Sequence, residues 1–276
     1  MLFSLLQEHT TLFSFSVAFL GLIIGSFLNV VIVRIPHMVL EVFESDPPSF
    51  NLLWPASHCP KCQVTIHWFD NIPILSFIWL KGQCRHCQQK ISPRYPFVEA
   101  LTAILSYIVA LHFGPTLYTA WSLMLVWALI ALAMIDFEHT ILPDNITLPF
   151  LWVGLFANTF DVFTSAKEAI LGAIIGYLSL WIIFWVFKLL TRKEGMGYGD
   201  FKLLALLGAW LGWQALPLII LVASFLGSVV GISLILLKKK DRNSAVPFGP
   251  FLAIAGYSVL LLFPHLNTFY FKLFAL

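Results

Sequence analysis

The sequence predicts an all-α polytopic membrane protein with about eight transmembrane helices and a small cytoplasmic domain between the first and the second. Composition, apolar runs and charge placement all support this. Hydrophobic residues make up 59% of the 276 residues and charged residues only 11%, and the mean hydropathy is +0.88. Because a soluble domain carries about a quarter charged residues, this composition excludes a soluble globular protein.

Eight apolar runs are candidates for membrane spans. They cover residues 12–33, 97–113, 117–135, 146–160, 169–190, 201–211, 215–237 and 251–271. No Lys or Arg precedes residue 34, so we expect the first run to be a retained helix and not a cleaved signal peptide. The fourth and sixth runs are short for a bilayer core of about 30 Å, so seven or fewer complete spans, or a re-entrant segment, are alternatives.

The placement of positive charge predicts the orientation. Cytoplasmic loops gather Lys and Arg, and with eight spans every Lys and Arg except Lys167 and Lys272 falls on one side. We therefore expect a multi-pass protein with both chain ends outside the cytoplasm. The basic run 238–240 is explained by orientation and contact with lipid headgroups, and no nucleic-acid partner is expected.

Charge and composition divide the chain into a first helix (1–33), a polar cytoplasmic domain (34–96) and a membrane domain (97–276). The polar domain holds two Cys-x-x-Cys pairs, separated by the 21 residues 63–83: Cys59 and Cys62, Cys84 and Cys87. This spacing predicts a tetrahedral four-thiolate zinc site. Two disulfides or four unligated thiols are alternatives, although a reducing cytoplasm disfavours disulfides. Four thiolates leave zinc no open position, so the metal is expected to be structural.

Two acids at the ends of apolar runs are the candidates for catalysis. Asp200 follows three glycines in the stretch 195–200, and Asp136 follows the third apolar run. With eight spans both lie at the cytoplasmic face, where a pair of carboxylates sharing one proton can activate water and protonate a leaving group. Each acid taken alone is equally well explained as a helix end or cap. A transporter with the acids as proton or cation sites is a further alternative.

Several motifs together carry a resemblance to a known family. They are Gly-Ser-Phe-Leu-Asn-Val (25–30), the two cysteine pairs, Asp-Asn-Ile-Pro (70–73), Ser-Pro-Arg-Tyr-Pro (92–96), Asp136 with Leu-Pro-Asp (142–144), Gly-Tyr-Gly-Asp-Phe-Lys (197–202) and Pro-Phe-Gly-Pro (247–250). From Gly25 to Ala253 the chain resembles the type IV prepilin peptidases, bifunctional leader peptidases and N-methyltransferases of the bacterial inner membrane that serve type IV pili and type II secretion.

The resemblance implies that Asp136 and Asp200 are the catalytic aspartates of a Gly-x-Gly-Asp aspartic protease. It implies prepilin and pseudopilin substrates, whose short basic leader is removed at the cytoplasmic face and whose new N-terminus is methylated from S-adenosylmethionine. For methyl transfer it suggests Gly82, although a turn glycine explains this residue equally well. Glu41 and Glu99, near the membrane boundary of the polar domain, are weaker candidates for binding the cationic donor or the substrate amine. A peptidase alone, with the zinc domain recognising substrate, stays an alternative.

Overall fold

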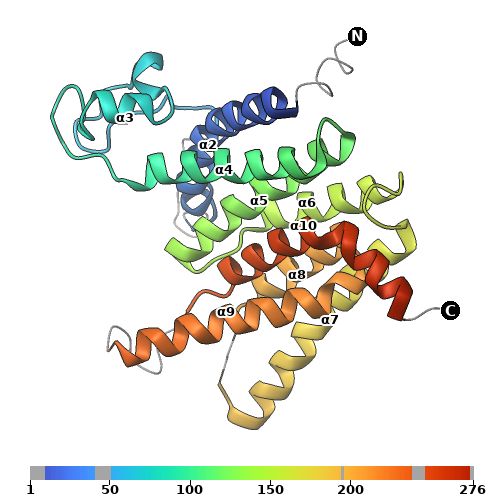
Figure 1. Ribbon diagram of the computed structural model, residues 1–276. Coiled ribbons are helices and arrows are strands. Elements are labelled where there is room, and N and C mark those ends of the chain that lie inside the picture. Colours follow the sequence, from blue (N-terminus) through green and yellow to red (C-terminus); the bar gives the residue numbers. More distant parts are fainter. Residues whose placement is uncertain (1–9, 41–50, 194–195, 238–245, 274–276) are drawn as a thin grey trace. The chain divides into compact units, whose positions relative to one another are not determined.

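The computed structural model describes residues 10–40, 51–193, 196–237 and 246–273, with backbone alone for 263–273. It forms two compact units, 1–131 and 132–276, and each is treated by itself. The described residues form helices and no strand, apart from two isolated β-bridges. The membrane helices are α2 (Thr10–Leu40), α4 (Arg94–Phe113), α5 (Leu117–His139), α6 (Asp144–Asn158), α7 (Ala166–Thr191), α8 (Tyr198–Leu211), α9 (Leu216–Leu236) and α10 (Gly249–Leu273) (Figure 1). Short turns complete the set, namely η2 (Trp68–Asn71), α3 (Leu75–Trp79) and η3 (Trp213–Ala215).

A helix occupies each of the eight predicted positions, which confirms an all-helical polytopic membrane protein. Five helical segments are long and apolar enough to cross a bilayer: α2, α4, α5, α7 and residues 213–236. In α10 the residues described with side chains, Gly249–Leu262, also form an apolar helix. Helices α6 and α8 have 15 and 14 residues. At 1.5 Å per residue each is about 21–23 Å long, which is short of a core of about 30 Å, as the two short apolar runs indicate.

Helix boundaries follow local signals that hydropathy alone does not give. Helix α2 continues beyond the apolar run, past Pro36 to Leu40. Helix α4 begins directly after Pro93 and ends at Gly114, whose φ of 63° and N–H bond to the Ala110 carbonyl terminate the helix. Helix α7 begins after Ser165, whose side chain accepts the Glu168 N–H as an N-cap.

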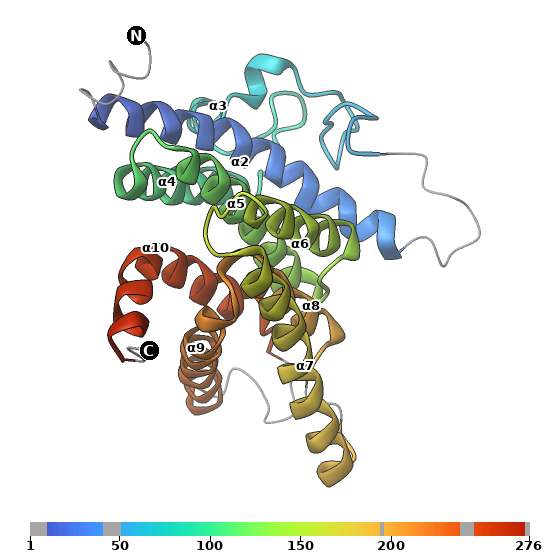
Figure 2. The ribbon, with the colours of Figure 1, turned by 90° about the vertical axis from the view of Figure 1, so that its right-hand side faces the viewer.

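In the N-terminal unit, α2 lies against α4, as both views show (Figures 1 and 2). The backbones approach closely at Gly25, where a Cβ would lie 2.7 Å from the Glu99 Cα. One turn further along α2, the Asn29 side chain donates hydrogen bonds to the carbonyls of Gly25 and of Tyr95 on α4, at 3.2 and 3.1 Å. Small residues and an interhelical amide therefore join these two helices, as is usual in membranes.

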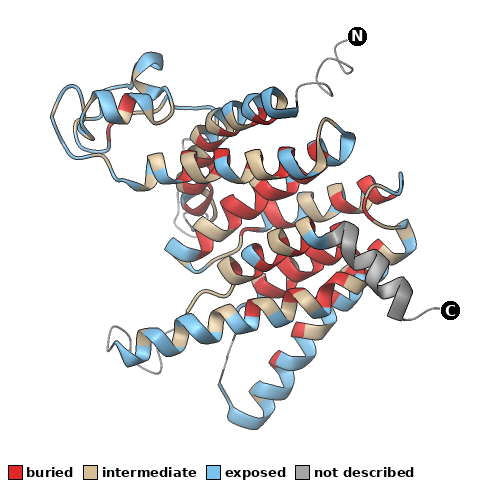
Figure 3. Cartoon of the chain, in the orientation of Figure 1, coloured by how far each residue is buried: buried red, intermediate tan, exposed pale blue. Residues whose placement is uncertain are grey.

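The C-terminal unit is built around α8. Every residue of α8 from Phe201 to Leu211 except Lys202 is buried (Figure 3), and α8 contacts α6, α7, α9 and α10. A helix that is apolar on all sides requires such an environment. Its last carbonyls are satisfied from α6, because Asn158 Nδ2 donates to the carbonyls of Ala209 and Trp210, at 2.8 and 2.9 Å.

The contact between α7 and α8 depends on two facing glycines. A Cβ on Gly208 would overlap the backbone carbonyl of Gly172, and a Cβ on Gly172 would overlap that of Gly208. Backbone atoms cannot move aside as a flexible side chain can. The two helices therefore pack at a distance that only glycine permits at this crossing.

We expect Gly208→Ala to lower the free energy of unfolding by about 1–3 kcal/mol, because the added methyl forces α7 and α8 apart. Thermal unfolding in detergent checks this. Gly231→Ala on α9 is the matched control, since nothing lies within 4 Å of a Cβ there. Equal melting temperatures for the two variants would contradict the proposed close packing.

Candidate functional site

Two acids of the C-terminal unit are brought together near the N-terminus of α8. Asp136 lies in the last turn of α5 and Asp200 in the first turn of α8. Their exposed fractions are only 5% and 6%. The carboxylates are close enough for the charge of Asp136 to act on that of Asp200. Two residues 64 positions apart in the sequence thus form one buried acidic pair.

The Asp136 carboxylate is held by the start of α10. Its Oδ2 accepts the backbone N–H of Gly249, the first residue of that helix, at 2.8 Å. The N-terminus of a helix carries partial positive charge, so this contact favours a carboxylate. A Cβ at Gly249 would lie 2.6 Å from the same oxygen. The Pro-Phe-Gly-Pro motif therefore needs glycine at this position.

Asp200 is placed by the glycines before it. A backbone hydrogen bond from Gly197 reaches its carboxylate. Gly199 packs against Leu142, whose Cβ would lie 2.7 Å from a Cβ at this position. These contacts fix the chain as it enters α8, while Gly195 of the same stretch lies outside the described residues.

An ion pair lies beside the start of α8. Lys202 Nζ contacts both carboxylate oxygens of Asp144, the first residue of α6, at 2.6 and 2.8 Å. The pair is partly exposed, with 30% of the Lys202 side chain and 52% of the Asp144 side chain accessible, and such pairs contribute no more than about 1 kcal/mol. The charge of Lys202 is therefore matched by Asp144, and the pair ties α8 to α6.

In the N-terminal unit, the four cysteines form one cluster. Their sulfurs all lie within 4.8 Å of one another, with Cys59 3.7 Å from Cys87 and Cys62 4.0 Å from Cys84. All four thiols are free, so no disulfide forms. A tetrahedral ion with bonds of about 2.3 Å separates its sulfurs by about 3.8 Å, which matches these contacts.

The two cysteine loops repeat the same local structure. In each, the N–H of the residue four positions after the first cysteine (Gln63 or Gln88) donates to that cysteine's carbonyl, at 2.9 and 3.0 Å. Both glutamines have positive φ. Each loop is also closed by one β-bridge, His58 with Thr65 and Gln83 with Lys90. Each loop therefore presents its two sulfurs in the same way.

Backbone donors already favour thiolates in this cluster. The N–H groups of Cys62 and Lys61 lower the pKa of the Cys59 thiol to about 6, and those of Cys87 and His86 lower the pKa of Cys84. At Cys62 the Val64 N–H acts in the same direction, but desolvation and the neighbouring sulfurs outweigh it and raise the pKa to about 11. Four crowded sulfurs cannot all ionise without a cation, so the donor set fits a metal ion.

The remaining candidates for methyl transfer differ in their surroundings. Gly82 is a turn residue with φ of 68°, and a Cβ there would lie 3.1 Å from the Phe77 ring, so its backbone role is sufficient to explain it. Glu99 is buried on α4 and accepts the Ile74 N–H at 2.8 Å. Glu41 lies outside the described residues.

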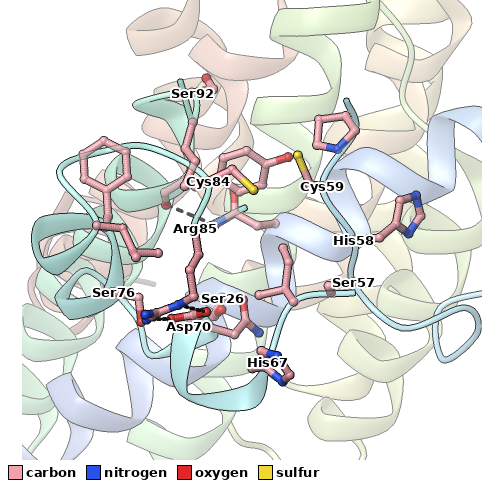
Figure 4. A pocket seen from close by; sticks show the side chains of 18 of the residues that line it. Ser26, Ser57, His58, Cys59, His67, Asp70, Ser76, Cys84, Arg85 and Ser92 are labelled. Carbon is pink, nitrogen blue, oxygen red and sulfur yellow. Dashed lines mark hydrogen bonds and ion pairs between the residues drawn. The ribbon is translucent and has the colours of Figure 1, made fainter. Parts of the chain in front are cut away.

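Sequence reasoning missed three contacts of these sites: the Gly249 N–H on Asp136, the pair of Lys202 with Asp144, and the ion pair of Arg85 with Asp70 (Figure 4). Arg85 lowers the pKa of Asp70 through a hydrogen bond and its charge. Every one of these residues except Arg85 belongs to a motif quoted above, so the motifs marked the positions without giving the contacts.

Fold and sites together define a polytopic membrane protein with a buried pair of acids and a four-cysteine cluster. Two family models match the chain: the bacterial peptidase A24 N-terminal domain over residues 19–113, and the type IV leader peptidase family over residues 123–232. The chain belongs to the type IV leader peptidase family and is a membrane enzyme.

Several curated relatives match over nearly the whole chain. A protein of Aeromonas hydrophila is 51% identical over 261 residues, which cover 90% of either chain. A protein of Pseudomonas aeruginosa is 47% identical, with coverage of 93% of this chain and 92% of its own. Another, of Dichelobacter nodosus, is 47% identical, with coverage of 92% and 93%. All three are named prepilin leader peptidase/N-methyltransferase. No solved structure matches the chain.

We expect the purified protein to carry about one metal ion per chain, and Cys84→Ser to lose it, because three thiolates and a hydroxyl hold a thiophilic ion poorly. Elemental analysis after gel filtration measures this. His86→Gln is the control, since this exposed neighbour lies outside the cluster, and it should keep the metal. A folded, metal-free wild-type protein would contradict the metal assignment.

Proposed function

We propose that this enzyme removes the leader peptide of prepilins and pseudopilins with Asp136 and Asp200, and then methylates the new N-terminus. The observation that carries the catalytic part is the burial of both acids next to each other in the C-terminal unit. The names of the relatives support both the substrate class and the second activity.

The chemistry follows from the buried pair. Two carboxylates at such a site share one proton, because a second negative charge there is costly. The ionised carboxylate takes a proton from a water molecule as the water oxygen attacks the scissile carbonyl carbon, and the protonated carboxyl group gives its proton to the carbonyl oxygen. As the C–N bond breaks, the first carboxyl group passes the proton it took from water to the leaving amine. The second carboxylate regains a proton when the carbonyl of the new carboxyl group forms again. The Gly249 N–H keeps the Asp136 carboxylate oriented throughout.

We propose the cytoplasmic side of the bacterial inner membrane as the location of this reaction. The one-sided distribution of Lys and Arg supports this orientation. The basic leader of the substrate then stays in the cytoplasm while its hydrophobic helix stays in the bilayer. Cleavage between the basic leader and the hydrophobic helix needs a site that water can reach, at the ends of membrane helices. The two acids lie at such helix ends, Asp136 in the last turn of α5 and Asp200 in the first turn of α8.

For the N-terminal unit we propose a structural zinc ion held by Cys59, Cys62, Cys84 and Cys87. A bound zinc ion ties the two loops to each other and supplies no open coordination position for water. Between residues 51 and 93, the described part of this segment, the chain has only short helical turns and two isolated β-bridges, so we expect its shape to depend on this cross-link. S-adenosylmethionine is the proposed methyl donor.

We expect Asp136→Asn and Asp200→Asn each to lower prepilin cleavage by about 10²–10⁴-fold, because an amide can neither accept nor supply the proton. Gel electrophoresis of a purified prepilin, with a labelled methyl donor present, measures cleavage and methylation together. Asp161→Asn, in an exposed loop, is the control.

Both aspartate variants should still methylate a synthetic peptide that begins at the mature N-terminus. Full cleavage by Asp200→Asn would refute the catalytic pair and revive the transporter alternative. If wild-type protein cleaves prepilin but the product carries no labelled methyl group, the enzyme is a peptidase without methyltransferase activity.

We expect Gly249→Ala to lower cleavage about tenfold or more, because its methyl displaces the Asp136 carboxylate and weakens a charge-assisted hydrogen bond. The initial rate of prepilin cleavage measures the effect, with Gly231→Ala as the control. A wild-type rate for Gly249→Ala, with unchanged melting temperature, would show that this N–H does not position Asp136.

A further inference from the structure

A cavity of about 480 Å³ lies in the N-terminal unit, between α2, α4 and the cysteine-bearing segment (Figure 4). Its size is within the range of small-molecule sites, about 300–1,000 Å³. Apolar residues make up part of its wall: Val30, Val33, Ile72, Ile74 and Ile91. Two buried polar side chains, from α2 and α4, also line it.

The first of these is Glu99, with an exposed fraction of 8%. Its carboxylate accepts the Ile74 N–H at 2.8 Å and a hydrogen bond from Ser26. No Lys, Arg or His among the described residues forms an ion pair with it. Because a buried carboxylate without a counter-charge is costly, the cavity favours a cationic occupant.

The second is Asn29, with an exposed fraction of 4%. Its Nδ2 donates to the Gly25 and Tyr95 carbonyls, so the orientation of the amide is set. Its Oδ1 is buried and has no hydrogen-bond partner in the described part of the chain. A buried, unpaired carbonyl oxygen costs about 1–3 kcal/mol, and an N–H or O–H donor on a ligand removes this cost.

The two arginines that line the cavity have partners of their own. Arg85 donates two hydrogen bonds to Asp70, and Arg34 donates to the carbonyls of Asn51 and Pro55. Lys90 also lines the cavity, but its side chain is exposed. The wall of the cavity therefore includes a buried carboxylate without a counter-charge, and the lining residue Asn29 has an amide oxygen without a hydrogen-bond partner among the described residues. This pattern fits a positively charged ligand that also carries hydrogen-bond donors and apolar surface.

We propose that this cavity is the binding site of the methyl donor, an adenosyl sulfonium, with the sulfonium against Glu99. The inference rests on the proposed methyltransferase function. During transfer the lone pair of the neutral pilin amine forms the N–C bond, the C–S bond breaks, and its electron pair stays on sulfur. The ammonium formed then loses a proton to water. The sulfur of the product is neutral, so its attraction to Glu99 is lost and release is favoured.

The test compares the donor with its demethylated product, S-adenosylhomocysteine, by equilibrium binding to the zinc-loaded, full-length protein in detergent. Wild type should bind the sulfonium more tightly than the thioether. Glu99→Gln keeps the shape and an acceptor for the Ile74 N–H, and it should weaken sulfonium binding about tenfold or more while leaving thioether binding unchanged. Asp161→Asn, which removes a charge from an exposed loop, should change neither.

Other outcomes overturn the proposal. If Glu99→Gln binds the sulfonium as tightly as wild type does, the proposed contact between the sulfonium and the Glu99 carboxylate is wrong. If donor affinity is unchanged but the KM for the cleaved peptide rises, the carboxylate binds the peptide ammonium instead, and the assignment to the donor is wrong. Wild-type protein that cleaves prepilin but transfers no methyl group refutes the proposed methyltransferase function itself, which is a different failure.

A measurement on wild-type protein keeps the proposal testable if Glu99→Gln does not fold. Ultraviolet cross-linking of labelled S-adenosylmethionine, followed by peptide mapping, should place the label within residues 26–34 or 57–99. Label confined to residues 132–276 would refute the cavity as the donor site.

Discussion

The cost of burying negative charge governs the arrangement of the C-terminal unit. Asp136 and Asp200 are both nearly inaccessible, and each is approached by a backbone donor, from Gly249 and Gly197 respectively. These donors are available only because α10 begins beside the end of α5 and the chain turns tightly into α8. The close packing of α7 on α8 at Gly172 and Gly208 holds α8 in that position. Glycines thus position the two acids in two ways, by donating backbone hydrogen bonds to them and by allowing α7 and α8 to pack closely.

Groups that carry or can carry negative charge are also crowded or buried in the N-terminal unit, and each has a different partner. Four sulfurs within 4.8 Å of one another form a donor set that fits a metal cation. Asp70 is matched by Arg85 within the chain. No cation among the described residues pairs with Glu99, and the proposed counter-charge is the sulfonium of a substrate. Of these negative charges, the structure pairs Asp70 with an arginine, while a shared proton, a metal ion and a ligand are the proposed partners of the other three groups.

Much of this organisation could be predicted from the sequence. Apolar runs located the eight long helices of the described residues, five of which are long and apolar enough to cross a bilayer, because hydropathy reports burial in lipid or protein directly. The spacing of the four cysteines predicted their cluster, since short loops restrict where the sulfurs point. The charges of the loops predicted that Asp136 and Asp200 lie at the same membrane face, and the two acids are buried next to each other in the C-terminal unit.

Other features depended on distances that no local pattern encodes. The Gly249 N–H, for example, reaches an acid 113 residues away. The unpaired Asn29 oxygen and the cavity beside it arise from the packing of α2, α4 and the cysteine-bearing segment. Such contacts are set by tertiary packing, and sequence motifs identify only the positions involved.

The central claim is that two aspartates work as one proton-sharing pair on a peptide bond. An experimental structure of the enzyme with an uncleaved prepilin-derived peptide tests it most directly. We expect the carboxylates of Asp136 and Asp200 to lie within about 6 Å of each other, on either side of the scissile carbonyl. Carboxylates more than about 10 Å apart, or a scissile bond in contact with neither, would contradict it.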